Sequence, residues 1–285
     1  MIQPNPSESP TGRPPMLRIA AVQMISTARG EENLVTAGGL IAEAGAQGAR
    51  LVALPEYFPI MGMSEGDQLQ VVEADACAGG NAGPIQSFLV DTARQHGIWL
   101  IGGSIPLAAR SPDKVLNSTL VIGPGGERLG RYDKIHLFGF RKGAERYDES
   151  ESIEAGHEVV AVDTPVARIG LSICYDLRFP ELYRAMGAVD LIVVPAAFTE
   201  TTGRAHWEIL LRARAIENQC YVLAVGQGGR HENGRETHGN SMIIDPWGNI
   251  LDRKLKGPGV VVADIDFAHL AEIRASLPAL RHRVL

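Results

Sequence analysis

The chain has 285 residues, 45% of them hydrophobic, so it can bury a sizeable core, and we expect one large domain. Its net charge of −6 is mildly acidic, which argues against a nucleic-acid-binding surface and favours small molecules as partners. The three cysteines, Cys77, Cys174 and Cys220, have the spacing of neither a disulfide framework nor a zinc site, which indicates a reducing cytoplasm.

The beginning of the chain differs in composition from the rest. Residues 1–15 are rich in Pro, Ser and Gly and lack the apolar run of a signal peptide. We therefore expect a disordered tail ahead of a folded domain over residues 16–285. No apolar run is long enough to span a bilayer, so we expect no membrane partner.

The first elements predict a parallel pair of strands. Residues 17–24 form a near-continuous apolar run, which is typical of a strand covered on both faces. Apolar residues then recur at helical spacing over residues 31–47, and residues 50–54 are again a buried strand. That strand leads into Glu56, which therefore lies at a carboxyl strand end, where ligands gather in open α/β sheets.

The rest of the chain mixes crossovers with hairpins. We expect helices over residues 84–96, 205–218 and 267–276, and strands over residues 98–103, 117–122, 127–132, 158–163, 166–173, 189–195, 221–226, 241–245 and 260–265. Residues 141–156 are charged and look like a loop. The pattern favours a mixed α/β fold, either one mixed sheet or two sheets packed face to face with helices outside.

Cys174 falls where a strand gives way to a helix. Residues 168–173 are apolar, and Phe179-Pro180-Glu181 has the pattern of a helix start. A tight turn at such a junction exposes a nucleophile and directs nearby backbone N–H groups at the oxyanion. The alternative is that Cys174 is a small buried apolar residue.

Glu56, Lys134 and Cys174 are chemically complementary. A carboxylate can take the proton of a thiol, and an ammonium group can stabilise the negative charge of a tetrahedral intermediate. Together they suit acyl transfer from an amide or a nitrile. Glu56 could instead be a cap or an ion-pair partner, and Lys134 could lie on the surface.

The histidines raise two alternative hypotheses: the protein could be a Cys–His hydrolase, or it could contain a metal site. No HExxH motif or tight Cys/His spacing supports a metal, and we expect none. The histidines concerned are His136, His206, His231 and His238.

Three segments resemble the motifs of one known superfamily. LPEYF around Glu56, YDKIHLF around Lys134 and GLSICYDLRFPELYR around Cys174 resemble, in order, the three motifs of the nitrilase, or carbon–nitrogen hydrolase, superfamily. The resemblance extends from Leu17 to the C-terminus. It implies a single carbon–nitrogen hydrolase domain with a four-layer αββα sandwich fold and no cofactor.

The resemblance also implies roles for individual residues. Cys174 would be the nucleophile, Glu56 the general base and Lys134 the cation that assists the tetrahedral intermediate. The backbone N–H of Tyr175 would join Lys134 in the oxyanion hole. The second glutamate of the family resembles Glu149 in RYDESESIEAG, with Glu145 and Glu151 as alternatives.

Residues 205–250 resemble one branch of this superfamily, the Nit1-type amidases that hydrolyse deaminated glutathione to 2-oxoglutarate and Cys-Gly. An omega-amidase acting on 2-oxoglutaramate is the nearest alternative; another amidase, an N-carbamoyl hydrolase or a nitrilase also stays open. A thiol-dependent acyltransferase and an inactive binding protein are alternatives of other classes. The resemblance implies a homodimer or higher homo-oligomer, for which residues 205–216 and the tail after Pro278 are candidate contacts.

The predicted substrate carries carboxylates, so its pocket needs cations. Arg178, four residues beyond Cys174, is our candidate, because arginine binds carboxylates in bidentate fashion. The alternative is a structural ion pair of Arg178 with Glu181 or Asp176. Weaker candidates, chosen only for their loop positions, are Arg141, Lys142 and Arg230.

Overall fold

The structure is a computed structural model that describes residues 14–143 and 145–284. The tail predicted over residues 1–15 therefore lies almost entirely outside the described residues. Across the described part of the chain, no helix combines the length and the hydropathy that crossing a membrane requires.

The first sheet joins the N-terminal half of the chain to its last strand. Its order is β16 (Gly259–Asp266), β1 (Met16–Gln23), β2 (Leu51–Ala53), β3 (Trp99–Ile101), β5 (Val115–Ile122) and β4 (Ile105–Ala108), and β6 (Arg128–Asp133) and β9 (Ile153–Glu154) also pair with β5. The predicted parallel pair is confirmed: β1 runs parallel to β2, and Ile19 lies opposite Leu51.

The second sheet is built from the C-terminal half. Its order is β10 (Ala161–Asp163), β11 (Arg168–Leu171), β12 (Leu191–Ala196), β13 (Tyr221–Gly226), β14 (Ser241–Ile244) and β15 (Ile250–Lys254). The three strands β11, β12 and β13 are parallel. The carboxyl ends of β11 and β12 lead directly into Cys174 and Ala197.

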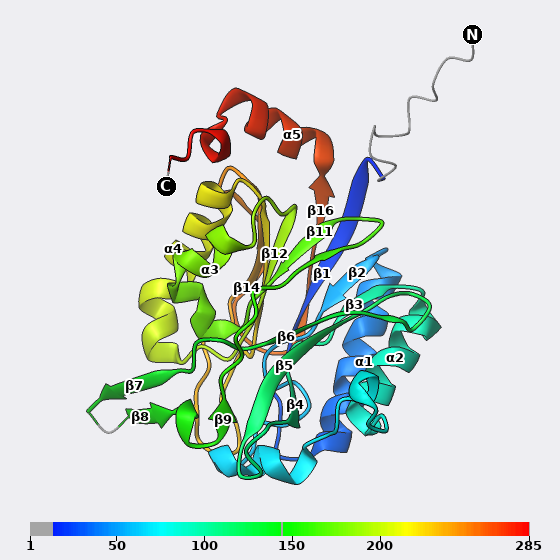
Figure 1. Ribbon diagram of the computed structural model, residues 1–285, viewed down its shortest axis with the longest axis vertical. Coiled ribbons are helices and arrows are strands. Elements are labelled where there is room, and N and C mark those ends of the chain that lie inside the picture. Colours follow the sequence, from blue (N-terminus) through cyan, green and yellow to red (C-terminus); the bar gives the residue numbers. More distant parts are fainter. Residues whose placement is uncertain (1–13, 144, 285) are drawn as a thin grey trace.

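The two sheets pack face to face, with helices on both outer sides (Figure 1). Helices α1 (Gly30–Ala46) and α2 (Pro84–His96) cover the first sheet, and α3 (Pro180–Ala185) and α4 (Glu200–Asn218) lie on the second. Helix α5 (Phe267–Ser276) follows β16 near one end of the sheets. This is the four-layer αββα sandwich that the family resemblance implied, and it decides between the two arrangements that the sequence pattern had left open.

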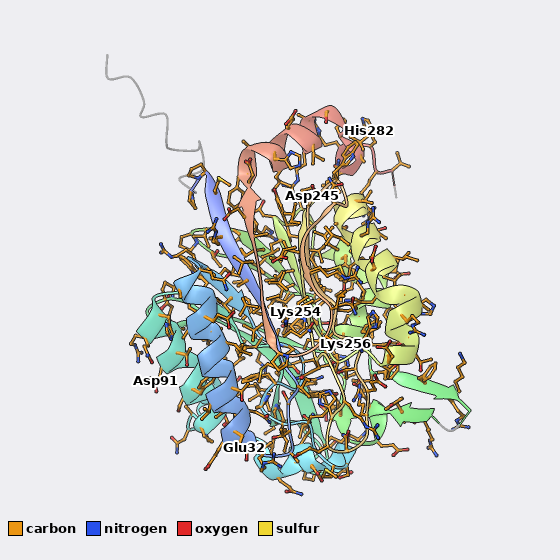
Figure 2. All side chains as sticks on the ribbon, turned by 180° about the vertical axis from the view of Figure 1, so that it is seen from behind. Glu32, Asp91, Asp245, Lys254, Lys256 and His282 are labelled. Atoms are coloured by element: carbon orange, nitrogen blue, oxygen red, sulfur yellow. The ribbon has the colours of Figure 1, made fainter. Side chains whose placement is uncertain are left out.

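Strand β1 shows why its sequence is apolar at nearly every position. Ile19 and Ala21 point into the core between the sheets, whereas Ala20 and Val22 belong to the core under α1 and α2. Successive side chains of a strand point to opposite faces, so a strand covered on both faces needs apolar residues throughout. Figure 2 shows the charged Glu32 and Asp91 on the outer side of α1 and α2.

The predicted loop over residues 141–156 is wrong in part. The strands β7 (Gly139–Lys142) and β8 (Glu145–Asp148) pair there as an antiparallel hairpin, and a 3-10 turn over Glu149–Glu151 follows. The β7 strand is largely exposed, so it has no buried face and no alternating apolar pattern to reveal it.

The apolar face predicted over residues 205–216 mostly belongs to the core. Trp207, Leu211 and Ala215 are buried, whereas Ile209 and Ile216 are exposed. Helix α4 begins at Glu200, earlier than predicted, because the Thr199 side chain caps it by accepting a hydrogen bond from the Thr202 N–H.

Candidate active site

The Glu56 carboxylate sits at the carboxyl end of β2 and is fully buried. Its Oε1 accepts hydrogen bonds from Lys134 Nζ at 2.9 Å and from Asn117 Nδ2 at 3.0 Å, and its Oε2 accepts one from the Ala197 N–H at 2.8 Å. These donors come from the two sheets, so Glu56 lies at the seam where the sheets meet. Glu56 therefore does form an ion pair, as one of the alternatives had it, and its partner is Lys134.

Lys134 follows β6 and is also fully buried, contrary to a surface position. Its ammonium group lies between two carboxylates: Glu56 on one side, and Glu149 at 2.9 and 2.7 Å from its two oxygens on the other. Burial alone would lower the Lys134 pKa, but the nearby Glu149 and Glu56 carboxylates outweigh it and raise the pKa, so the amine stays protonated.

Of the three glutamates considered for the second position, Glu149 contacts Lys134. Besides Lys134, its oxygens accept hydrogen bonds from the Tyr57 hydroxyl at 2.8 Å and the Phe138 N–H at 2.7 Å. Glu151 is exposed and pairs with Arg146. The side chain of Glu145 lies outside the described part of the chain.

Cys174 occupies a tight turn directly after β11. Its φ of 52° lies in the left-handed region, which non-glycine residues seldom adopt, and a 3-10 turn over Cys174–Arg178 starts there. The thiol is buried, and burial raises its pKa well above the ordinary value, with the neighbouring Glu56 carboxylate adding to the effect. The resting sulfur is therefore a thiol with a carboxylate close enough to influence it.

Asp176 fixes the shape of this turn. Its carboxylate accepts hydrogen bonds from the Ile173 N–H at 2.9 Å, the Tyr132 hydroxyl at 2.7 Å and the His136 N–H at 3.0 Å. It therefore ties the Cys174 turn to the segment that carries Lys134. The His136 ring also contacts Asp176 and stacks on Phe179 at 3.7 Å, which places it in a structural role.

The other histidines also have partners elsewhere. His206 contacts Arg178, His231 contacts Ser26 and Thr237, and His238 contacts Glu200. Within the described residues, none of them forms a hydrogen bond with Cys174. The geometry therefore favours a Cys–Glu pair over a Cys–His pair.

The residue after Glu56 also has a strained backbone, which fixes the position of Glu56. Tyr57 also has a left-handed backbone, with φ 56°, and its N–H donates to Ser104 Oγ at 3.0 Å. Gly103 beside it has φ +54°, and a Cβ there would come within 2.2 Å of the Pro55 carbonyl oxygen. Only glycine allows the two chain segments to approach this closely.

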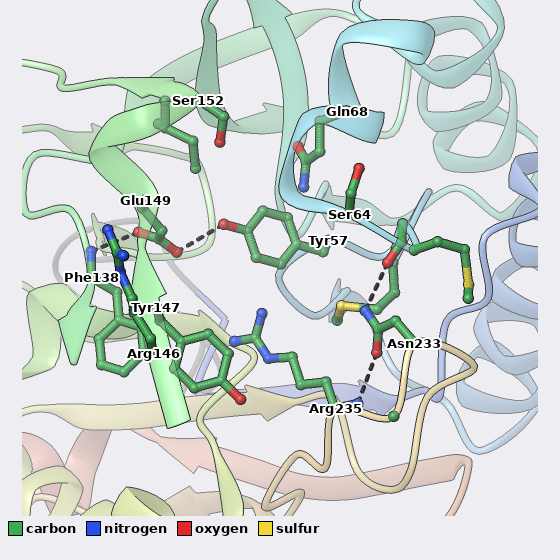
Figure 3. A pocket seen from close by; sticks show the side chains of 15 residues that line it. Tyr57, Ser64, Gln68, Phe138, Arg146, Tyr147, Glu149, Ser152, Asn233 and Arg235 are labelled. Atoms are coloured by element: carbon green, nitrogen blue, oxygen red, sulfur yellow. Dashed lines mark hydrogen bonds between the residues drawn. The ribbon is translucent and has the colours of Figure 1, made fainter. Parts of the chain in front are cut away.

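Two cavities lie beside these groups. A cavity of about 400 Å³ is bounded by Tyr57, Phe138, Glu149 and Arg235 (Figure 3). A smaller one is lined by Cys174, Tyr175, Arg178 and Phe198 among others. Phe138 lines both cavities, so the two are neighbours. The larger one lies beside Glu149 and the smaller one beside the sulfur of Cys174.

Arg178, the residue proposed from the sequence to bind a substrate carboxylate, lines a cavity together with Cys174. Its guanidinium stacks over Tyr175 and Phe198, with 5.6 and 5.4 Å to the ring centroids, and lies 3.2 Å from His206 Nδ1. Among the described residues it forms no ion pair with Glu181 or Asp176, so the ion pair considered as the alternative is absent. The weaker candidates Arg141, Lys142 and Arg230 are exposed and line neither cavity.

The sequence reasoning missed several residues that shape the site. Asn117 and the Ala197 N–H bind Glu56, Asp176 holds the turn, and Arg235 borders the larger cavity. Asp176 was inside a recognised motif and could have been found there. Asn117 and Ala197 lie in or directly after apolar strands, and only their spatial position reveals their contacts.

The comparisons with known proteins point to one family. Residues 18–275 match the family model described as carbon-nitrogen hydrolase. The chain is 42% identical over 271 residues to a protein of Synechocystis named deaminated glutathione amidase, covering 93% of this chain and 97% of that protein. It is 36% identical over 272 residues to a human protein of the same name, covering 93% and 81%.

Solved structures show the same fold. The crystal structure of the Caenorhabditis elegans NitFhit protein superposes with a TM-score of 0.83 at 39% identity, over 95% of this chain and 66% of that one. The family match and the identity to these relatives both extend over most of the chain. The chain therefore belongs to the carbon-nitrogen hydrolase family, which confirms the family resemblance and makes it a hydrolase of carbon–nitrogen bonds.

Proposed function

We propose that the protein is an amidase that cleaves the amide bond of a small, carboxylate-bearing substrate through a thioester on Cys174. The substrate that we propose is deaminated glutathione, which would yield 2-oxoglutarate and cysteinylglycine. The observation that carries the chemistry is the buried Lys134 ammonium between Glu56 and Glu149, with the Cys174 thiol beside Glu56. The similarity to deaminated glutathione amidases supports the choice of substrate.

In the first half-reaction, Glu56 takes the proton of the Cys174 thiol, and the sulfur attacks the amide carbon. The negative charge moves to the carbonyl oxygen, which we assign to Lys134 and the Tyr175 N–H. Protonation of Glu56 weakens its attraction for Lys134, so more of the ammonium charge can act on the oxyanion. The carbon–nitrogen bond then breaks, and Glu56 returns the proton to the departing amine.

In the second half-reaction, Glu56 takes a proton from water, and the resulting hydroxide attacks the thioester carbon. The carbon–sulfur bond breaks, the acid leaves, and the sulfur regains the proton from Glu56. Glu149 does not need to exchange a proton. Its contacts with Lys134, Tyr57 and Phe138 support a role in holding Lys134 in place.

Arg178 is our candidate for the carboxylate of the 2-oxo acid. It lines the smaller cavity together with Cys174, and no described carboxylate neutralises it. The acyl part of the substrate must reach the sulfur, so we assign to the acyl end the arginine that lines the same cavity as Cys174.

A substrate panel tests the function. Purified enzyme is assayed with deaminated glutathione, 2-oxoglutaramate, a simple nitrile and an N-carbamoyl amino acid, and Cys174→Ala provides the blank. We expect deaminated glutathione to give the highest kcat/KM and the variant to give none. A higher value for 2-oxoglutaramate would identify an omega-amidase, and full activity of Cys174→Ala would refute the mechanism.

Transfer of the acyl group to an added amine, in place of water, would identify an acyltransferase, and the products distinguish the two. Failure to trap an acyl-enzyme by mass spectrometry with every substrate would favour an inactive binding protein.

We also propose a homodimer or larger assembly in the cytoplasm, for which the exposed Ile209 and Ile216 on α4 are candidate contacts. Sedimentation of the purified protein measures its size.

A further inference from the structure

Arg235 presents an unusual cation to the larger cavity. Its Nη2 donates a hydrogen bond to the Ala197 carbonyl at 2.8 Å, and its guanidinium stacks over Tyr147 with 5.1 Å to the ring centroid. In Figure 3 the guanidinium reaches into the space between Tyr57 and Tyr147. The side chain therefore borders the cavity with its charged end.

The guanidinium is incompletely satisfied. Its Nε is buried and has no hydrogen-bond partner, and its side chain forms no ion pair with a carboxylate among the described residues. The buried Arg214, by contrast, donates to the Leu177 carbonyl and pairs with Glu217. A buried cation without a carboxylate partner is costly, so its persistence beside a cavity indicates that an anionic ligand pairs with the guanidinium.

The loop around Arg235 is held in place before any ligand arrives. The Asn233 side chain accepts a hydrogen bond from the Arg235 N–H at 2.9 Å and donates one to the Gly62 carbonyl at 2.7 Å. Through Ala197, Arg235 is also joined to Glu56, because the Ala197 N–H binds the Glu56 carboxylate. The cation is thus preorganised next to the reacting groups.

We infer that Arg235 binds the carboxylate of the leaving group, the far end of the dipeptide that departs when the amide is cleaved. This inference rests on the proposed function. The amine half of deaminated glutathione is a dipeptide and needs the larger cavity, because the space beside Cys174 and Arg178 is much smaller. A carboxylate would supply the negative charge that the guanidinium lacks, and a charge-assisted hydrogen bond is stronger than a neutral one.

The first experiment uses the unaltered enzyme. We compare kcat/KM for deaminated glutathione with kcat/KM for its neutral C-terminal glycinamide. We expect the amide to be about 10- to 100-fold worse, the loss typical of a charge-assisted hydrogen-bonded pair. If both forms are hydrolysed equally well, the inference is refuted and the proposed function stands. If neither is hydrolysed, the proposed function fails, and the inference fails with it.

The second experiment assigns the effect to Arg235. Arg235→Gln should lose about 10- to 100-fold in kcat/KM for deaminated glutathione, mainly through KM, and should no longer prefer the acid over the glycinamide. For 2-oxoglutaramate, whose leaving group is ammonia, the change should stay within about threefold. An equal loss on both substrates would overturn the inference, because it would place Arg235 in the support of Glu56.

Arg146→Gln is the matched control. It removes the same charge from the same cavity wall, but its guanidinium is exposed and already pairs with Glu151. We expect it to keep the preference for the acid over the glycinamide. If Arg146→Gln abolished this preference and Arg235→Gln did not, the carboxylate would bind elsewhere.

Discussion

Replacing Glu149 by glutamine should damage both stability and activity, although the two side chains have the same shape. Both oxygens of the Glu149 carboxylate act only as acceptors. Lys134 donates to both of them, the Tyr57 hydroxyl donates to one and the Phe138 N–H donates to the other. An amide must place its NH₂ group at one of the two oxygen positions. In either orientation that group faces Lys134, which can only donate.

The size of the effect follows from these contacts. A hydrogen bond to a charged group contributes about 1.5–3 kcal/mol, and breaking a buried ion pair costs about 3–5 kcal/mol. Lys134 keeps Glu56 as a partner in the variant, so we expect the free energy of unfolding to fall by about 3 kcal/mol, the lower end of the range for a broken buried ion pair. At about 2 °C per kcal/mol for a chain of this size, Tm should fall by about 6 °C. Displacement of Lys134 should lower kcat about 100-fold.

Thermal unfolding and steady-state kinetics measure both effects. Glu151→Gln is the control, since it removes the same charge two residues away from an exposed pair with Arg146. It should change stability by less than about 0.5 kcal/mol and leave kcat unaltered. If Glu149→Gln behaved like Glu151→Gln in both assays, Glu149 would not hold Lys134, and the reasoning would be wrong.

Three further predictions concern the sulfur, the acyl end and the backbone. The raised pKa of Cys174 favours the protonated thiol in the folded state, so the free energy of unfolding falls as pH rises above the ordinary thiol pKa of about 9. In denaturant titrations, Cys174→Ala should remove up to about 1.4 kcal/mol per pH unit of that decline. An identical pH profile for the variant and the unaltered protein would contradict the raised pKa. Arg178→Lys should raise KM about tenfold for deaminated glutathione and 2-oxoglutaramate alike, whereas an unchanged KM would leave Arg178 a structural role. Gly103→Ala should destabilise the fold by about 2 kcal/mol or more, because of its left-handed φ and the close Pro55 carbonyl. Gly39→Ala, on the exposed face of helix α1, should stabilise the fold by up to about 1 kcal/mol, and equal effects of the two variants in chemical denaturation would refute the strain argument.

The sequence determined the larger architecture because buried elements leave a strong pattern. Strand β1 is apolar throughout since both of its faces are covered, and the helices α2 and α5 begin and end where periodicity placed them. Long motifs around Glu56, Lys134 and Cys174 were enough to identify the family. The exposed hairpin of β7 and β8 was missed, since a strand without a buried face has no such pattern.

Only the tertiary structure decided which charges meet. Glu149 and Glu151 are two residues apart in one acidic stretch, yet one contacts the buried Lys134 and the other pairs with Arg146 in solvent. Arg235 is one arginine among many in the sequence, and only the fold brings it to the cavity beside Glu149 with a buried nitrogen unpaired. Hydrophobic periodicity records which face of an element is covered, whereas the partner of a polar side chain depends on distances between segments far apart in the chain.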